Sequence, residues 1–445
     1  MKHLHGEARW AHIAFSAILA AVSWFLPLEL ALQAHALFTI TIFTGAMWFS
    51  EALPLHVTAL LSTILLVLFA SVSPTAAFSH YFSPTVVLFF GGFMIARAMQ
   101  RHGLDRQIAL GVGSKFGSGP RLFLLGLMAI TTFLSLWISN TAATAIMLPI
   151  ALVTIGRLKK LESPYAKAMV LGIAFAATIG GIGTLVGTPP NGIVVANLAE
   201  KGIHISFLDW LGYGLPFAIL FLPVCWFILV SVFPPEIKKI EFTQKAGKWG
   251  AEHKLVLAVL VLTILTWVTS FAHHVADAVV AIGAVVLLYA LGLLRTDDLS
   301  KIEWSALILF GGGLALGAAI DSSGLGADIG GFLGGLLHGQ GIFVVFLAVI
   351  AFAVIMTLTA SNTATAAIII PIMIPLAAMV GVGVRQLAIL AGIGTSLDFI
   401  VPVGTPPSTI AYSTGYVRMG DMVKVGIPVT IAGALLLAFL AWLYW

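Results

Sequence analysis

The chain has little charge and almost no cysteine. Only 9% of its 445 residues are Asp, Glu, Lys or Arg, whereas soluble domains carry about 25%. Its one cysteine, Cys225, lies in an apolar segment, which excludes a disulfide within the chain and argues against redox chemistry. No metal-ligating cluster, phosphate-binding loop or nucleophile paired with a base stands out, so an enzyme is not expected. The basic residues sit in short loops, so the net charge of +4 does not indicate nucleic-acid binding.

Apolar sequence fills most of the chain. Hydrophobic residues make up 60% of it, which predicts an all-α polytopic membrane protein. About 20 apolar residues span a bilayer, and on that measure we expect about 11 transmembrane helices. These helices are expected at 12–28, 32–50, 55–72, 84–100, 166–200, 205–233, 255–272, 276–294, 304–320, 387–416 and 425–445. Lys2 and Arg9 precede the first helix as in a signal peptide, but its long apolar run favours a helix that is retained.

Two apolar stretches, 122–156 and 342–376, are too long for one span and too short for two. Basic residues flank the first stretch on both sides, and basic loops stay in the cytoplasm. They are Arg97, Arg101, Arg106, Lys115 and Arg121 in the loop 97–121, and Arg157, Lys159, Lys160 and Lys167 after the stretch. We therefore expect a re-entrant hairpin that enters from the cytoplasm. The second stretch follows Asp321 and Asp328 and precedes only Arg385, so we expect a hairpin that enters from outside.

These orientations give one consistent topology. With a cytoplasmic N-terminus, all Lys and Arg residues except Lys201 and Arg385 lie on the cytoplasmic side, and the C-terminus lies outside. We expect residues 1–30 to form an N-terminal segment with the first helix. The remaining divisions are a first repeat at 31–233, a Lys-rich cytoplasmic linker at 234–254 and a second repeat at 255–445.

The two halves repeat a set of motifs at separations of 217 to 222 residues. The pairs are Phe90-Gly91-Gly92 with Phe310-Gly311-Gly312, Gly103-Leu104 with Gly324-Leu325, Ser139-Asn140-Thr141 with Ser361-Asn362-Thr363, and Gly187-Thr188-Pro189-Pro190 with Gly404-Thr405-Pro406-Pro407. The two glycine-rich motifs are expected to be close-packing surfaces. Repeats of opposite orientation with interrupted helices are typical of secondary transporters, whose site lies at the repeat interface near the membrane midplane.

The Gly-Thr-Pro-Pro motifs are expected to break the helices at 166–200 and 387–416, because proline cannot continue the hydrogen-bond ladder. A broken helix exposes backbone carbonyls that can coordinate a cation such as Na⁺. A simple proline kink without a ligand is the alternative. Asp398 lies in the second broken helix, where the corresponding residue of the first half is Gly181. An acid inside a membrane is a candidate functional residue.

The two Ser-Asn-Thr triplets fall at the expected hairpin tips. Their hydroxyl and amide groups can bind an anion or a hard cation, and each is followed by a helix whose N-terminus favours an anion. The triplets are also good helix caps, a role compatible with ligand binding. Ser135 and Thr357 lie four residues upstream, on the same helical face, and could complete cation sites. The alternative for these two hydroxyls is a bond to a carbonyl of their own helix.

With these doubled motifs, the chain from about residue 30 to its end resembles the divalent-anion/sodium symporter family, the Na⁺-coupled di- and tricarboxylate and sulfate transporters. The resemblance implies a homodimer with a fixed scaffold domain and a mobile transport domain. The transport domain would carry both hairpins and both broken helices and move as an elevator. Some relatives are Na⁺-independent exchangers, so the coupling mode stays open at this point.

Carried onto this sequence, the resemblance implies two Na⁺ sites and one substrate site. The first Na⁺ would lie near Ser135, Ser139, Asn140 and the carbonyl of Gly187, and the second near Thr357, Asn362 and the carbonyl of Gly404. The substrate would be bound by Ser139, Asn140, Thr141, Ser361, Asn362 and Thr363, helped by Thr188 and Thr405. The repeat is imperfect where Pro407-Ser408 replaces Pro190-Asn191.

The sequence therefore favours a Na⁺-coupled importer of a C4-dicarboxylate in the inner membrane, with Na⁺, a small anion, lipid and a second copy of the chain as partners. A Na⁺-independent dicarboxylate or citrate exchanger and a sulfate or citrate symporter are the nearest alternatives. An ion channel is a more distant one, because re-entrant loops also build pores. A membrane enzyme would have only Asp398 as a candidate catalytic group.

Overall fold

A computed structural model describes residues 6–113, 119–156, 163–240, 246–402 and 404–445, and it contains helices and no strands over these ranges. The expected all-α membrane fold is confirmed. Eight of the described helices are long and apolar enough to cross a membrane. They are Leu32–Ser50, Pro74–His102, Pro164–Gly183, Phe207–Val232, Ala251–Val268, Trp304–Ser322, Asn362–Met379 and Met419–Tyr444.

The helices of the N-terminal half follow the expected spans closely. They are α1 (Gly6–Trp24), α2 (Leu32–Ser50), α3 (Leu55–Phe69), α4 (Pro74–Ser79), η1 (His80–Phe82), α5 (Pro84–His102), α6 (Leu104–Gly113), α7 (Pro120–Ser135), α8 (Asn140–Gly156), α9 (Pro164–Gly183), α10 (Pro189–Glu200) and α11 (Phe207–Val232). Several begin with proline in the first turn after a serine cap, as at Ser83 and Ser163. Proline suits this position because its missing N–H would have no partner there.

The C-terminal half repeats this order. Its helices are α12 (Ala251–Val268), α13 (Ser270–His273), α14 (Asp277–Ala290), η2 (Thr296–Lys301), α15 (Trp304–Ser322), α16 (Leu325–Leu337), α17 (Ile342–Thr357), α18 (Asn362–Met379), α19 (Val384–Gly394), α20 (Pro406–Ser413) and α21 (Met419–Tyr444). Of the basic residues used to orient the chain, Lys2, Lys115, Arg157, Lys159, Lys160 and Lys245 lie outside the described residues.

Two helices of ten or more residues were not predicted. The expectation of a plain loop at 97–121 is wrong, because α6 forms within it, and α16 forms at the corresponding place in the second half. Both helices are too short to be found by a search for apolar stretches of about 20 residues, the length of one span. Gly103 and Gly324 explain the repeated Gly-Leu motif, since their φ angles of 68° and 80° make the turn that starts each helix. Such positive φ angles favour glycine.

The two halves interlock by exchanging equivalent contacts. Helix α5 packs against α14, and its counterpart α15 packs against α3. At these contacts a Cβ atom on Gly91 would lie 2.5 Å from the Cβ of Ala281, and one on Gly312 would lie 2.6 Å from the Cβ of Ala59. The glycine-rich motifs are thus close-packing surfaces, as predicted.

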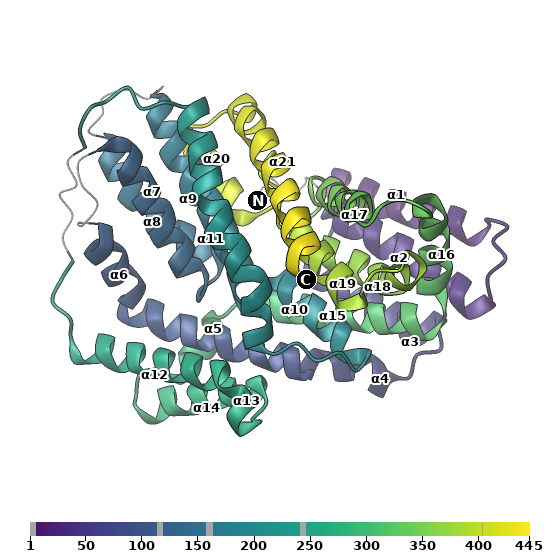
Figure 1. Ribbon diagram of the computed structural model, residues 1–445. Helices are drawn as coiled ribbons and strands as arrows, with labels where there is room; N and C mark the ends of the chain where they lie inside the picture. The colour runs from purple at the N-terminus through teal and green to yellow at the C-terminus, as the bar shows by residue number, and fades with distance from the viewer. Residues whose placement is uncertain (1–5, 114–118, 157–162, 241–245, 403) are drawn as a thin grey trace.

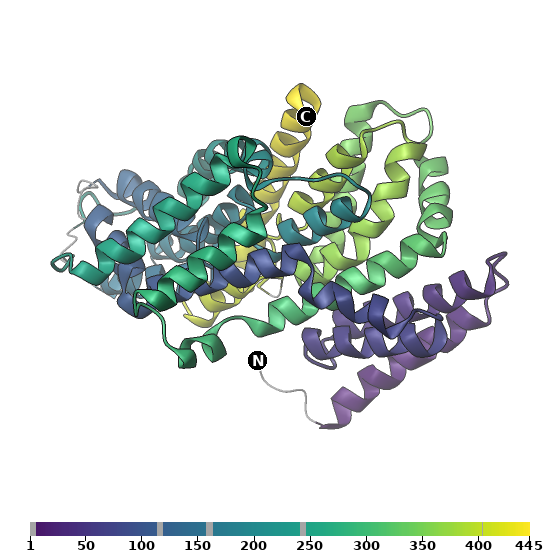
Figure 2. The same cartoon turned by 90° about the horizontal axis from the view of Figure 1, so that it is seen from below.

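The second arm of each broken helix packs on the opposite half. Helix α10 contacts α15, α18 and α19, while α20 contacts α8 and α9 (Figure 1). The helix pairs α7–α8 and α17–α18 lie on opposite sides of α21 in both views (Figure 1, Figure 2). Because α10 contacts α18 and α20 contacts α8, each helix pair that carries a Ser-Asn-Thr triplet is covered by a helix from the other half.

Candidate functional site

The first Ser-Asn-Thr triplet lies where one helix ends and the next begins. Helix α7 ends at Ser135 and α8 begins at Asn140, and the two helices pack against each other and against α9. Ser139 Oγ accepts a hydrogen bond of 3.3 Å from the backbone N–H of Ala142. This bond satisfies one of the free N–H groups at the start of α8, so the predicted capping role is confirmed here.

The second triplet has the same arrangement. Helix α17 ends at Thr357, α18 begins at Asn362, and both pack against α19. Ser361 is the N-cap of α18, and its Oγ accepts a 3.2 Å hydrogen bond from the N–H of Ala364. Thr141 and Thr363, which follow the two amides, are half-buried, as are both capping serines.

The upstream hydroxyls bond to the amides of the triplets. Ser135 Oγ donates to Asn140 Oδ1 over 2.7 Å, and Thr357 Oγ1 donates to Asn362 Oδ1 over the same distance. Ser135 Oγ also lies 2.7 Å from the carbonyl of Ala177 in α9. These partners are not carbonyls of the hydroxyls' own helices, so the alternative considered for them is wrong. Each tip presents a hydroxyl and an amide oxygen together, which are the oxygen ligands that hard cations prefer.

Both predicted helix breaks are present. Helix α9 ends at Gly183 and α10 begins at Pro189, while α19 ends at Gly394 and α20 begins at Pro406. Thr188 and Thr405 precede the second arms in extended conformation, with φ angles of −146° and −134°, and neither side chain caps the helix that follows. Each second arm opens on two prolines, which have no N–H, so α10 and α20 present fewer free donors than an ordinary helix N-terminus.

In the first half, three of the four expected cation ligands, Ser135, Asn140 and Gly187, are brought together around the backbone of Gly181, whereas Ser139 caps α8. A Cβ atom on Gly181 would collide with the Asn140 amide, and one on Gly187 would lie 2.5 Å from the carbonyl oxygen of Gly181. Asn191 Nδ2 donates to that same carbonyl over 2.9 Å. We call Ser135, Asn140, Gly181 and Gly187 the first cluster.

In the second half, Asp398 occupies the place of Gly181. Asn362 Nδ2 donates to Asp398 Oδ1 over 3.1 Å, and a Cβ atom on Gly404 would overlap Asp398 Oδ2. We call Thr357, Asn362, Asp398 and Gly404 the second cluster. The expected cation ligands did not include Asp398; its position inside an apolar segment was the available signal, and its contact with Asn362 depends on the tertiary structure.

Among the described residues, a buried oxygen without a hydrogen-bond partner lies in the second cluster and another lies beside the first. They are Asp398 Oδ2 in the second half and, beside the first cluster, Asn191 Oδ1. Free oxygens of this kind fit a hard cation such as Na⁺, which would supply the missing partner. A transition-metal centre finds no support, because the described residues include no group of three His, Cys, Asp or Glu side chains that could hold one.

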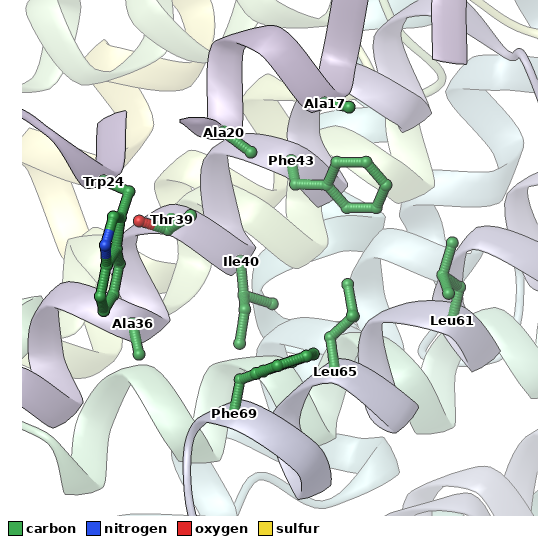
Figure 3. Close-up of a pocket in the computed structure, with 10 residues that line it drawn as sticks. All are labelled: Ala17, Ala20, Trp24, Ala36, Thr39, Ile40, Phe43, Leu61, Leu65 and Phe69. Carbon is green, nitrogen blue, oxygen red and sulfur yellow. The ribbon is translucent and has the colours of Figure 1, made fainter. Parts of the chain in front are cut away.

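A cavity of about 420 Å³ lies elsewhere, among α1, α2 and α3 (Figure 3). Trp24, Ile40, Phe43, Leu65 and Phe69 are among its lining residues, and it is almost wholly apolar. A dianion would be poorly solvated there, because charge in an apolar environment requires paired polar groups. The hairpin tips and helix breaks remain the candidate functional site.

Known proteins resemble this chain over most of its length. The model of the sodium:sulfate symporter transmembrane region matches residues 7–445. An uncharacterised transporter of Haemophilus influenzae is 35% identical over 421 residues, which cover 91% of this chain and 90% of that protein. The sodium-dependent dicarboxylate transporter SdcS of Staphylococcus saprophyticus is 35% identical, with 88% and 82% covered. SdcS of Staphylococcus aureus is 33% identical over 455 residues, with 94% and 87% covered.

Two solved transporters share the fold at low sequence identity. The YdaH transporter of Alcanivorax borkumensis superposes with a TM-score of 0.60 at 14% identity, over 98% of this chain and 97% of that chain. MtrF of Neisseria gonorrhoeae superposes with a TM-score of 0.58 at 14% identity, over 100% and 96%. These two similarities concern the fold alone.

Proposed function

Because this chain belongs to the sodium:sulfate symporter family, we propose that it couples uptake of a C4-dicarboxylate such as succinate, malate or fumarate to Na⁺. It is a multi-pass membrane transporter of the Na⁺/dicarboxylate type and not an enzyme. The observation that carries the proposal is the matching hydroxyl–amide pair at each tip, Ser135 with Asn140 and Thr357 with Asn362.

Each pair contributes oxygen ligands for one Na⁺ in the proposed mechanism. The carbonyl of Gly187 would complete the first site and that of Gly404 the second, since both glycines belong to the clusters around these amides. Ser139 lies at the edge of the first site, where its Oγ already caps α8. Cations bound beside the substrate lower the electrostatic cost of bringing a dianion to the membrane midplane.

The anion is proposed to lie between the two triplets, with Thr188 and Thr405 beside it. Neither hairpin, 122–156 or 342–376, contains Lys or Arg, so neutral dipoles and bound Na⁺ would hold the substrate. The start of α8 and the start of α18 contribute positive partial charge. A dicarboxylate has a negative group at each end, which suits two such tips better than one.

The proposed topology has a cytoplasmic N-terminus, an external C-terminus and hairpins entering from opposite sides. Side-chain ion pairs support it, because each joins residues that the sequence assigns to one side. Arg97 pairs with Asp298 on the expected cytoplasmic side, and Lys201 pairs with Asp321 on the expected outer side. Tyr444 Oη donates to the carbonyl of Gly212 over 3.1 Å, joining the expected spans 205–233 and 425–445 toward the ends assigned to the outer side.

We also propose an elevator movement and a homodimer in the bacterial inner membrane. Support for a mobile unit comes from the reciprocal packing, in which α10 contacts α18 and α20 contacts α8. Helices that cover one another across the halves would move together more readily than separately. The hairpins and broken helices would then carry substrate and Na⁺ as one body.

The test is uptake of radiolabelled succinate into proteoliposomes with an inward Na⁺ gradient, compared with equal gradients of K⁺ or choline. Uptake that requires Na⁺ is the expected result. Uptake without Na⁺ that depends on internal dicarboxylate would replace the symporter with an exchanger. Protein that binds Na⁺ but transports no succinate would contradict the choice of C4 substrate, and citrate and sulfate would then be tested.

A further inference from the structure

We infer that Asp398 is a charged ligand of the second cation site, so that the two Na⁺ sites differ in kind. The second site would bind Na⁺ through a carboxylate, and the first through neutral oxygens alone. This inference rests on the proposed function, since it requires that the protein bind Na⁺.

The Asn362 amide holds Asp398 in a defined orientation. Its Oδ1 accepts from Thr357 Oγ1 over 2.7 Å, and its Nδ2 donates to Asp398 Oδ1 over 3.1 Å. The amide is therefore fixed by a different partner at each end. The hydroxyl, amide and carboxylate form one continuous chain of polar groups in the second cluster.

The other carboxylate oxygen has no partner. Asp398 is only 1% exposed, and its Oδ2 accepts no hydrogen bond from the described residues. None of the ion pairs among those residues involves it. A buried carboxylate with one amide donor is poorly compensated, because a charge in a low-dielectric interior needs a counter-charge or several donors. A bound cation would provide this counter-charge.

Gly404 gives the free oxygen its space. A Cβ atom at Gly404 would overlap Asp398 Oδ2 and would lie 3.2 Å from the Cβ of Asp398. The carboxylate is thereby directed at the same backbone segment whose carbonyl is proposed to coordinate Na⁺. A serine hydroxyl in the same loop, Ser396 Oγ, is also buried without a partner among the described residues. This side of the cluster therefore has a second unpaired oxygen.

The first cluster has no equivalent charge. Gly181 takes the place of Asp398, and its carbonyl already accepts from Asn191 Nδ2 over 2.9 Å. A Na⁺ ion at the first site would remain an uncompensated charge until the dianion binds. We therefore expect Na⁺ binding without substrate to occur mainly at the second site, because charged ligands raise the affinity for a hard cation.

The experiment is a Na⁺ titration of the purified full-length protein without dicarboxylate, at ionic strength held constant with choline, with the thermal unfolding midpoint as readout. Wild type should be stabilised by Na⁺. Asp398→Asn keeps the shape and removes the charge, and we expect its apparent Na⁺ affinity to fall by roughly 10–100-fold, the range seen when the support of a metal ligand is removed. Asp321→Asn, which changes an acid paired with Lys201 at the end of α15, is the matched control and should respond like wild type.

The outcomes distinguish failure of this inference from failure of the proposed function. A normal Na⁺ response in Asp398→Asn would overturn the inference and leave the proposed function standing. A wild-type protein that ignores Na⁺ would overturn both.

A double-mutant cycle gives a second test that does not depend on Asp398→Asn folding well. Gly404→Ala should displace the carboxylate and weaken the Na⁺ response. In an Asp398→Ala background the same change should have no further effect on the response, since the colliding group is gone. Additive losses from the two changes would contradict the contact that the inference requires.

Discussion

The two triplet clusters share a framework but differ in charge. Each has a hydroxyl donating to an amide oxygen over 2.7 Å, at the point where one helix ends and the next begins. In the first half the amide rests on the backbone of Gly181, whereas in the second it donates to the carboxylate of Asp398. The geometry of the two tips is the same, and a single position gives the second one a carboxyl group.

A second difference accompanies the first. Asn191 bridges the first break by donating to the carbonyls of Gly181 and Thr184 over 2.9 and 2.7 Å. Its counterpart Ser408 has no amide, and its Oγ accepts from Thr405 Oγ1 over 3.3 Å. The first half thus stabilises its broken helix with a side-chain amide. In the second half the carboxyl group of Asp398, the proposed cation ligand, occupies the corresponding space.

The largest effect is expected when either amide is removed. Asn140→Ala and Asn362→Ala each delete a proposed cation ligand. Asn362→Ala also takes away the acceptor of the buried Thr357 hydroxyl, at a cost of about 1–3 kcal/mol, whereas Ser135 keeps the carbonyl of Ala177. Because coupled transport needs both sites, Na⁺-dependent succinate uptake should be lost in both variants despite the difference in charge between the clusters. Asn197→Ala, a buried asparagine whose amide bonds only within α10, is the matched control and should retain uptake. Uptake at the wild-type level in both tip variants would remove the site assignment.

A smaller and one-sided effect is expected at Gly181. A methyl group there would collide with the Asn140 amide, so Gly181→Ala should impair succinate uptake through the first site. The same variant should keep its stabilisation by Na⁺ in the absence of substrate, since that response is assigned to the second cluster. Gly283→Ala in α14, where a Cβ atom would meet open space, is the control and should transport normally. Loss of both uptake and the Na⁺ response in Gly181→Ala would show that the clusters are not separable.

The parts of the fold that sequence predicted are those with a local physical cause. Proline pairs at Pro189 and Pro406 stop a helix wherever they occur, and a polar triplet in an apolar stretch cannot lie in the middle of a lipid-facing span. Both helix breaks and both tips followed from these rules. Helix α6 did not, because its ten residues, Leu104–Gly113, carry charge and fall short of a span.

The remaining features depend on contacts between distant segments. The partner of Asp398 is Asn362, 36 residues away, and no local pattern in the sequence joins them. The exchange of α10 and α20 between the halves is likewise a property of packing. Sequence could identify Asp398 as unusual. Only the structure shows that Asp398 contacts the Asn362 amide in the same way that Gly181 lies against the Asn140 amide in the first half.

The ion pairs of the two halves also differ in burial, and changes to them are expected to have the smallest effect on transport. Asp298 from the second half lies between Arg97 and Arg101 of α5, fully buried, whereas Asp321 of α15 pairs with Lys201 at side-chain exposures of 45% and 35%. Asp298→Asn removes the carboxylate shared by the two guanidinium groups, leaves Arg101 with only the exposed Asp297 at 4.0 Å, and should lower stability by about 3 kcal/mol. Asp321→Asn should cost at most about 1 kcal/mol, because water screens an exposed pair.

The pH dependence of this stability difference provides the check. Burial raises the pKa of Asp298, but the N–H of Arg295 and the guanidinium groups of Arg97 and Arg101 outweigh it and hold the pKa below its ordinary value of 3.8. A carboxyl with a depressed pKa stabilises the fold above its unfolded pKa and loses that contribution as pH falls through the folded one. The gap in melting temperature between wild type and Asp298→Asn should therefore stay constant from about pH 7 to pH 5. A gap that closes within this range would mean that Asp298 is protonated more easily than its two arginine partners allow.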